Sequence, residues 1–255
     1  MYLNLRGKVA IVTGGGGGLG RAICKELARE GVKVVLSYRS NEKEINSFVD
    51  ELNEKYTGKV VAVKGDLINE ESIDNLFNAA IEEFSCVDIL VNNAGVWPTA
   101  YVKDMEVEDF QRTMIINLQV PFILSKKMVN HLIDRESKGK IINIVSQAAF
   151  HGSTTGHAHY AASKGGLVTF TVSLAREVAK YGINVTAVAP GIMRTKMNEQ
   201  QLNNKGDEDY YMKRIPLGRI SEPEEVAYTV VFLASNRADY ITGATIDVTG
   251  GMLMR

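Results

Sequence analysis

The fold of this chain is decided by residues 8–20, which read KVAIVTGGGGGLG. The apolar run Val9–Val12 predicts a short buried strand, and the amphipathic stretch from Leu19 onward predicts a helix. Between them, glycines without a Cβ let the backbone turn tightly and approach a phosphate. The N-terminus of the following helix offers free N–H groups and the positive end of its dipole. A flexible linker would also be glycine-rich, but the position between strand and helix favours a dinucleotide site.

The rest of the chain alternates short β-branched runs with longer amphipathic stretches. Most strand candidates are continuous apolar runs, which is typical of strands covered on both faces and hence of a parallel sheet. The alternation predicts an α/β fold, a doubly wound sheet of about seven strands with helices on both faces. The expected strands are 8–13, 32–38, 59–64, 87–92, 140–146, 183–189 and 244–248, and the expected helices are 19–30, 41–56, 70–84, 106–133, 160–180 and 222–234.

The composition is that of an ordinary globular protein, with 45% hydrophobic and 23% charged residues in 255. Basic residues number 29 and acidic residues 30, so the chain lacks the basic field that attracts nucleic acids or anionic membranes. The cysteines, Cys24 and Cys86, form neither a disulfide framework nor a zinc-ligand spacing. No apolar run reaches the about 18 residues that span a bilayer. We expect no signal peptide, a cytoplasmic location, and no nucleic-acid or membrane partner.

No proline- or serine-rich linker and no internal repeat divides the chain, so residues 1–255 are expected to form one dinucleotide-binding domain. Residues 191–220 depart from the alternation of strands and helices. They carry three methionines and the pair Tyr210–Tyr211. Because a segment of this length outside the sheet is usually functional, we predict that residues 191–220 form a substrate lid.

Three residues predict a proton-transfer site. Tyr160 and Lys164 are four residues apart in an expected helix, so their side chains share one face. A free phenol has a pKa of about 10, but a nearby ammonium group lowers this pKa and makes the phenol a better base. Ser146 ends an expected strand, and carboxyl ends of parallel strands face the ligand crevice. A Tyr-x-x-x-Lys pair by itself is also typical of a solvated helix face.

These motifs together resemble the short-chain dehydrogenases/reductases, over essentially the whole chain. The resemblance rests on T-G-x-x-x-G-x-G at 13–20, N-N-A-G at 92–95, Asn117, Ser146, Y-x-x-x-K at 160–164, and P-G at 190–191 followed by Thr195. It implies a Rossmann-type sheet of strand order 3-2-1-4-5-6-7. It also implies an enzyme that transfers a hydride between a nicotinamide cofactor and a carbonyl or secondary alcohol.

The resemblance assigns a role to each catalytic candidate. Tyr160 would be the general acid/base, Ser146 would polarise the carbonyl, and Lys164 would modify the tyrosine pKa and contact the nicotinamide ribose. Asn117 would hold a water molecule of the proton relay, and Thr195 would contact the carboxamide. The expected cofactor-binding residues are Gly14, Gly18, Leu19, Gly20, Ser37, Arg39, Ser40, Asp66, Leu67, Asn93, Ala94, Gly95, Tyr160, Lys164, Pro190, Gly191, Ile192 and Thr195.

The end of the second expected strand bears on the choice of cofactor. NAD-preferring sites usually carry Asp or Glu there, whereas this chain has no acid before Glu42. Arg39 can pair with a 2′-phosphate, which favours NADP(H). Gly17 stands where NADP-preferring relatives often carry a basic residue, so use of NAD(H) stays open, and a solvated Arg39 is the alternative. Asp66-Leu67 resembles the adenine contact of the family.

The expected substrate pocket mixes aromatic and methionine side chains with a few polar groups, which suits a medium-sized carbonyl compound. Packing in the hydrophobic core explains the aromatic and methionine residues of this set equally well. The spacing of Ser146 and Tyr160 is one residue longer than the commonest spacing in the family, and the loop between them carries three histidines. No Asp, Glu or Cys accompanies these histidines in residues 151–159, so we expect no metal. The pocket residues are Trp97, Ser146, Gln147, His157, Tyr160, Met193 and Met197.

Two subfamilies and one different class compete for the function. Y-R-S at 38–40 and G-G-M at 250–252 are similar to glucose dehydrogenases, whereas L-A-R-E-V-A at 174–179 is similar to 3-oxoacyl-carrier-protein reductases. A non-catalytic NADP-binding sensor is the third reading, but sensors usually lose the tyrosine or the lysine. The long expected helices 106–133 and 160–180, the second with apolar residues on several sides, predict a homotetramer, with a monomer as the alternative.

Overall fold

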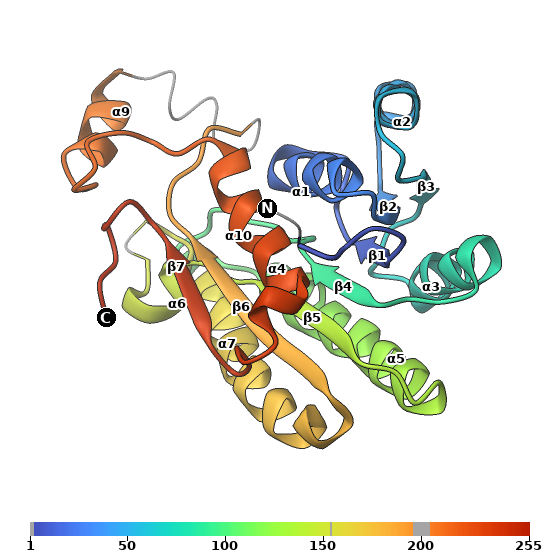
Figure 1. The fold of residues 1–255 in the computed structure, drawn as a ribbon. Helices are drawn as coiled ribbons and strands as arrows, with labels where there is room; N and C mark the ends of the chain where they lie inside the picture. The colour runs from blue at the N-terminus through green and yellow to red at the C-terminus, as the bar shows by residue number, and fades with distance from the viewer. Residues whose placement is uncertain (1–2, 154, 196–204) are drawn as a thin grey trace.

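Seven parallel strands form one sheet of order β3-β2-β1-β4-β5-β6-β7, as predicted. The computed structural model describes residues 3–153, 155–195 and 205–255. Figure 1 shows the strands side by side, with the glycine turn directly after β1. The strands are β1 (Val9–Val12), β2 (Lys33–Tyr38), β3 (Val60–Lys64), β4 (Ile89–Asn92), β5 (Gly139–Ile144), β6 (Ile183–Pro190) and β7 (Thr245–Val248).

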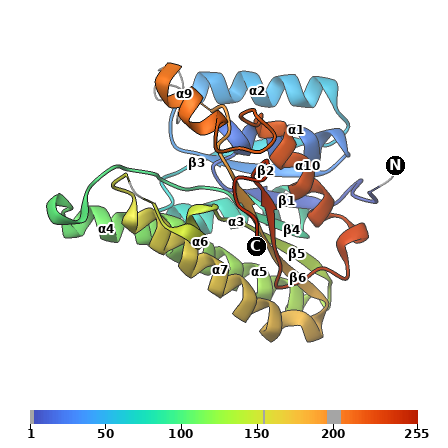
Figure 2. The same ribbon diagram turned by 90° about the vertical axis from the view of Figure 1, so that its left-hand side faces the viewer.

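Helices cover both faces of the sheet, so the molecule has three layers (Figure 2). One face carries α1 (Gly18–Arg29), α2 (Glu42–Lys55) and α10 (Pro223–Ala234). The other carries α3 (Glu70–Phe84), α5 (Val120–Asp134) and α7 (Ala158–Val178). Shorter helices are α4 (Val107–Met114), α6 (Ala148–His151) and α9 (Lys205–Met212). No helix within the described residues is both long and apolar enough to cross a membrane.

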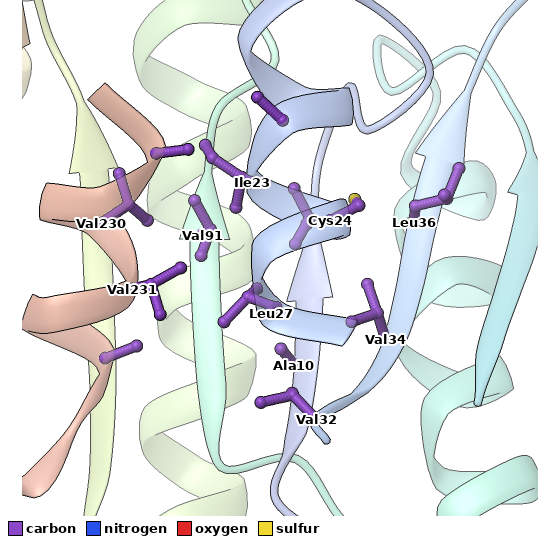
Figure 3. Packing of buried hydrophobic residues seen from close by; sticks show 14 of the residues in the cluster. Ala10, Ile23, Cys24, Leu27, Val32, Val34, Leu36, Val91, Val230 and Val231 are labelled. Carbon is purple, nitrogen blue, oxygen red and sulfur yellow. The ribbon is translucent and has the colours of Figure 1, made fainter. Parts of the chain in front are cut away.

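The double covering explains why β1 is apolar at every position. Ala10 and Val12 point into the cluster under α1 and α10, whereas Ile11 between them points into the cluster under α3 and α5. Figure 3 shows Ile23 and Leu27 of α1 on the side of Val230 and Val231 of α10, while Cys24 points toward Leu36 of β2. Adjacent strand residues alternate between the two faces, so both faces must be apolar when both are buried.

Two expected elements differ from the structure. The helix expected over 106–133 is three elements, because a π-helical turn, η2 (Ile115–Gln119), separates α4 from α5. The strand expected to end at Ser146 ends at Ile144, so Ser146 lies in the connection that follows it. In residues 191–220, Met193 forms a bridge with Ser221. Residues 196–204, and Met197 with them, lie outside the described residues, and the substrate lid stays a prediction.

The glycine turn is shaped by close contacts of the backbone. Gly14 and Gly18 have φ values of +63° and +43°, a region that favours glycine. A Cβ on Gly20 would lie 2.1 Å from the Gly14 carbonyl oxygen, and one on Gly15 would lie 2.6 Å from Leu36 Cβ. Gly17 has nothing within 4 Å of its Cβ position and an extended backbone. Only some of the five consecutive glycines are therefore required by space.

This difference predicts opposite outcomes for two matched substitutions. Gly20→Ala forces a Cβ against backbone and should lower the free energy of unfolding by about 1–3 kcal/mol, as overpacking does. Gly17→Ala enters open space and should change it by less than about 1 kcal/mol. Urea unfolding followed by circular dichroism measures both. Equal losses in the two variants would show that the close approach at Gly20 does not constrain the turn.

Candidate active site

The turn after β1 and the segment after β4 are joined by hydrogen bonds at the carboxyl edge of the sheet. Thr13 Oγ1 accepts hydrogen bonds from the backbone N–H groups of Asn93 and Ala94, both at 2.9 Å. In return, Asn93 Nδ2 donates to the carbonyl oxygens of Thr13 at 2.8 Å and Gly14 at 3.2 Å. Adjacent parallel strands end at this same edge, so the predicted cofactor residues from β1 and β4 lie together.

The other expected cofactor residues gather along this edge. The Cβ position of Gly18 lies 3.3 Å from Thr195 Cγ2, which brings the segment after β6 against the glycine turn. Ser37 is buried, and its Oγ accepts a hydrogen bond from the Gly14 N–H at 3.0 Å, so this side chain holds the turn. The remaining residues lie at strand or helix ends. Leu19 and Gly20 are in the first turn of α1, Arg39 and Ser40 are exposed after β2, Asp66 and Leu67 follow β3, and Gly95 follows β4. Pro190 ends β6, and Gly191 and Ile192 follow it.

The catalytic candidates converge on one end of α7. Ser146, in the connection after β5, lies near enough to Tyr160 to oppose the effect of burial on the tyrosine pKa. Lys164 is buried, its Nζ donates to the Ile144 carbonyl oxygen at 2.7 Å, and Nζ lies 5.9 Å from the centroid of the Tyr160 ring. A Cβ on Gly95 would lie 3.5 Å from Lys164 Nζ, so the glycine lets the backbone after β4 approach the ammonium group. Ser146, Tyr160 and Lys164 are thus brought together as the sequence predicts.

The electrostatics of the tyrosine differ from expectation. We expected Lys164 to lower the pKa of Tyr160, but burial raises this pKa above its ordinary value, and the hydrogen bond with Ser146 only opposes the rise. Burial also lowers the pKa of Lys164 to about 8. The cause is desolvation, which disfavours the charged form of both groups. In this environment Tyr160 therefore stays protonated at neutral pH.

Asn117 ties the π-helical turn to the segment after β4. Its Oδ1 accepts from the Val96 N–H at 2.9 Å, and its Nδ2 donates to the Val96 carbonyl at 3.0 Å and to Ser163 Oγ at 3.0 Å. Ser163 Oγ in turn donates to the Tyr160 carbonyl oxygen at 2.7 Å. Asn117 is completely buried, so its side chain couples the turn between α4 and α5 to the helix that carries Tyr160 and Lys164.

The expected pocket residues within the described ranges fall into two groups. Trp97 stacks on His157 with 4.4 Å between ring centroids and meets the Tyr160 ring edge-on at 6.5 Å. His157 is buried, with Nδ1 2.8 Å from the Pro98 carbonyl oxygen. In the second group, Gln147 directly follows Ser146 and is buried, and Met193 is half-buried after β6. Within the described ranges, no three His, Cys, Asp or Glu side chains are grouped to hold a metal ion.

Sequence reasoning missed three contributors. Thr13 appeared only as part of the glycine motif, yet its hydroxyl joins two strands. Ser163 gave no signal beyond its place before Lys164, although it links Asn117 to Tyr160. Met252 lies 105 residues from Gln147 in the chain and contacts its side-chain amide. Only the tertiary fold could reveal this last contact.

Comparisons with known proteins agree with this geometry. A family model described as enoyl-(acyl carrier protein) reductase matches residues 15–253. The 3-oxoacyl-[acyl-carrier-protein] reductase FabG of Rickettsia prowazekii is 42% identical over 252 residues, which cover 99% of both chains. Among solved structures, a short-chain dehydrogenase/reductase described as glucose/ribitol dehydrogenase, from Brucella melitensis, superposes with a TM-score of 0.91 at 32% identity over 100% of both chains. A dehydrogenase/reductase from Sinorhizobium meliloti gives a TM-score of 0.91 at 33% identity, covering 99% of this chain and 98% of that one.

The sheet order and the helices on both faces define a Rossmann-type α/β protein. Within that class, the chain belongs to the short-chain dehydrogenase/reductase family. It is an oxidoreductase of CH–OH and carbonyl groups.

The role of the hydrogen bonds between Asn117 and the Val96 backbone can be tested by comparison with a second asparagine that makes similar bonds. Asn53 makes the same reciprocal pair of bonds with the Val60 backbone, at 2.7 Å and 3.0 Å, far from the site along the chain. Asn117→Ala leaves buried groups unpaired and should lower the free energy of unfolding by about 1–3 kcal/mol. Asn53→Ala, at an exposed side chain, should lower it by less. Only Asn117→Ala should also lower turnover. A similar loss of turnover in both variants would mean that Asn117 has no local role.

Proposed function

We propose that this protein is an NADP(H)-preferring oxidoreductase that transfers a hydride between the cofactor and a carbonyl or secondary-alcohol substrate through Ser146, Tyr160 and Lys164. The observation that carries the proposal is the convergence of Ser146 and Tyr160 beside the buried Lys164, whose Nζ lies 5.9 Å from the centroid of the Tyr160 ring. The four candidates Asn117, Ser146, Tyr160 and Lys164 are all present, which argues against a non-catalytic sensor. The glycine turn, with Thr195 against Gly18, fits a dinucleotide because backbone alone lines much of it.

The proposed chemistry divides between cofactor and protein. A bound nicotinamide supplies the hydride in reduction and accepts it in oxidation. Tyr160 donates the proton to the carbonyl oxygen in reduction, and its raised pKa keeps it in the acid form that this step needs. Ser146 donates a hydrogen bond to the same oxygen and holds it against the phenol. The Lys164 ammonium group stabilises the negative charge left on Tyr160 after the proton transfer.

The preference for NADP(H) rests on the surface after β2. Arg39 is exposed, and within the described residues it forms no ion pair that would hold it away from a phosphate. No acid is present at residues 37–41 to bind a ribose hydroxyl instead. Both features support recognition of a 2′-phosphate, with NAD(H) as a weaker second cofactor.

The proposed oligomer is a homotetramer. Phe110 of α4 and Phe122 of α5 are 42% and 48% exposed, and on the opposite layer Tyr228 and Phe232 of α10 are 54% and 40% exposed. Large apolar side chains on two separate faces support two interfaces. Two isologous contacts of this kind generate a closed dihedral tetramer.

Tyr160→Phe is the decisive test of the catalytic assignment. It removes only the hydroxyl that donates the proton, so turnover of an active substrate should fall to background while cofactor affinity stays unchanged. A panel of carbonyl compounds and alcohols, followed at the absorbance of the reduced nicotinamide, measures turnover, and fluorescence titration measures cofactor binding. Near wild-type turnover in the variant would refute the assignment.

Arg39→Ala tests the cofactor preference. Loss of a charge-assisted phosphate contact should cost about 1.5–3 kcal/mol, so NADPH affinity should fall tenfold or more while NADH affinity hardly changes. Lys55→Ala, which removes an exposed cation at the far end of α2, is the control for a general loss of positive charge. Isothermal titration with both cofactors measures the effect. Equal losses for NADPH and NADH in Arg39→Ala would show that Arg39 does not read the phosphate.

The two interfaces can be separated by charge. Light scattering of the wild type should give a mass four times the 28.0 kDa of one chain. Phe122→Glu should leave a dimer held by α10, Phe232→Glu should leave a dimer held by α4 and α5, and the double variant should be a monomer. A wild-type mass of one chain would contradict the tetramer.

A further inference from the structure

Ser146 is bound to the single helical turn that follows it. Its Oγ accepts a hydrogen bond from the Ala148 N–H at 3.2 Å, and its carbonyl oxygen accepts one from the Ala149 N–H at 3.0 Å. Both donors belong to α6. A hydroxyl group has one proton and two acceptor lone pairs, so a bond accepted from the backbone points the proton away from that N–H. The orientation of α6 therefore decides where Ser146 can donate.

This helix is too short to keep an orientation of its own. It has only four residues, and an isolated turn is unstable in water because helix nucleation is unfavourable. Contacts with the rest of the protein must hold it. On one side α6 approaches α7, where the Cβ position of Gly165 lies 3.6 Å from the Ala149 carbonyl oxygen. Its other support is Phe150, which packs against a buried cluster that includes Val145.

A cation from beyond β7 covers the ring of Phe150. The guanidinium carbon of Arg255 lies 3.6 Å from the ring centroid, the shortest such distance among the cation–ring contacts of the described residues. Gly250 and Gly251, with φ values of +63° and +87°, turn the chain after β7, and Figure 1 shows it running back alongside α6. The guanidinium group is attracted to the face of the ring.

The position of Arg255 is in turn fixed by β7. Its Nε lies 3.0 Å from Asp247 Oδ2, and its Nη2 donates to Asp247 Oδ1 at 3.0 Å and to the Thr245 carbonyl oxygen at 3.3 Å. A carboxylate that binds the planar guanidinium at two points also fixes its plane. Because β7 pairs with β6, this anchor belongs to the central sheet. Contacts thus run from the sheet through Arg255 and Phe150 to the helix that binds Ser146.

We infer that Arg255 is a positioning residue for the proposed reaction: by holding Phe150 and α6, it sets the direction in which the Ser146 hydroxyl donates. This inference rests on the proposed function, in which Ser146 holds the reacting oxygen. Arg255 acts through α6 and not on the substrate. Without the guanidinium group α6 tilts more freely, and the hydroxyl spends less time aligned with the reacting oxygen.

The same misalignment has a second consequence, at Tyr160. Ser146 opposes the rise of the tyrosine pKa that burial causes. In alcohol oxidation Tyr160 accepts a proton, so it must first be deprotonated. A serine that no longer faces the phenol leaves the pKa of Tyr160 higher, and oxidation then requires a higher pH. Lys164 is the charged group beside Tyr160, and its hydrogen bond to the Ile144 carbonyl oxygen does not involve α6.

The test uses Arg255→Ala in the intact protein, with the preferred cofactor and the most active ketone and alcohol of the substrate panel. The kcat of ketone reduction should fall by about two- to tenfold, while the KM of the cofactor stays unchanged. The pH profile of kcat/KM for alcohol oxidation, which reports groups of the free enzyme, should move to higher pH. Arg255→Lys keeps a cation for Asp247 and Phe150, so it should restore most of both properties.

Lys33→Ala is the matched control. Lys33 opens β2, and its Nζ lies 5.4 Å from the centroid of the Phe84 ring, so the variant removes a cation–ring contact that does not involve α6. It should leave kcat and the pH profile unchanged. Asp247→Asn leaves the guanidinium group in place but weakens its anchor, and it should give smaller changes in the same directions as Arg255→Ala. Melting temperatures show which variants are folded, and Asp247→Asn tests the inference where Arg255→Ala does not fold.

Several results would overturn the inference. Unchanged kcat and pH profile in Arg255→Ala, or equal changes in Lys33→Ala, would show that the guanidinium group does not orient Ser146. A fall in kcat without a shift of the pH profile, or no recovery in Arg255→Lys, would assign the loss to packing. Ser146→Ala separates these results from a failure of the proposed function. If the wild type turns over no substrate, or if Ser146→Ala is as active as the wild type, the proposed function itself fails, and the inference falls with it.

Discussion

The site depends on the contact between the turn after β1 and the segment after β4. Four hydrogen bonds join Thr13 and Gly14 to Asn93 and Ala94 across two neighbouring strands, and two of them go to backbone carbonyl oxygens of the turn itself. The strands must therefore end in register for the turn to take its shape. Gly14 and Gly20 complete the constraint, since the approach of Gly20 to the Gly14 carbonyl leaves no room for a Cβ. Rigid pairing of this kind presents backbone N–H groups to a ligand without reorganisation.

From this contact, the constraint passes through buried polar groups to α7, the helix that carries Tyr160 and Lys164. The segment after β4 continues to Val96, and Asn117 of the π-helical turn forms two hydrogen bonds with the Val96 backbone. Asn117 also donates a hydrogen bond to Ser163 on α7. Lys164 is anchored separately, by its bond to the Ile144 carbonyl at the end of β5. The positions of Tyr160 and Lys164 are thus fixed by contacts with the ends of β4 and β5 and with the π-helical turn η2. Burial, which raises the pKa of Tyr160 and lowers that of Lys164, is a consequence of the same packing.

Sequence patterns predicted the elements well where one physical signal dominates. Continuous apolar runs located all seven strands, because both faces of the sheet are buried, and the motif order indicated the strand order. The patterns failed where a local side-chain contact overrides periodicity. The apolar pattern of residues 106–133 continues through the π-helical turn, and nothing in it marks the point where Asn117 must face Val96. Likewise, the end of β5 at Ile144 depends on pairing with β6, which no local pattern encodes.

The sequence by itself determined the class of fold, the glycine turn and the identity of the candidate catalytic residues. Each of these features can be recognised from the types and the spacing of residues that are close together in the chain. Only the tertiary structure decided how these groups are held and charged. The direction of the Tyr160 pKa shift depends on how deeply the phenol is desolvated, which is a property of the packed protein. The contact between Gln147 and Met252 joins residues 105 positions apart. Long-range contacts and burial arise only when distant segments close on one another, so they are absent from any local stretch of sequence.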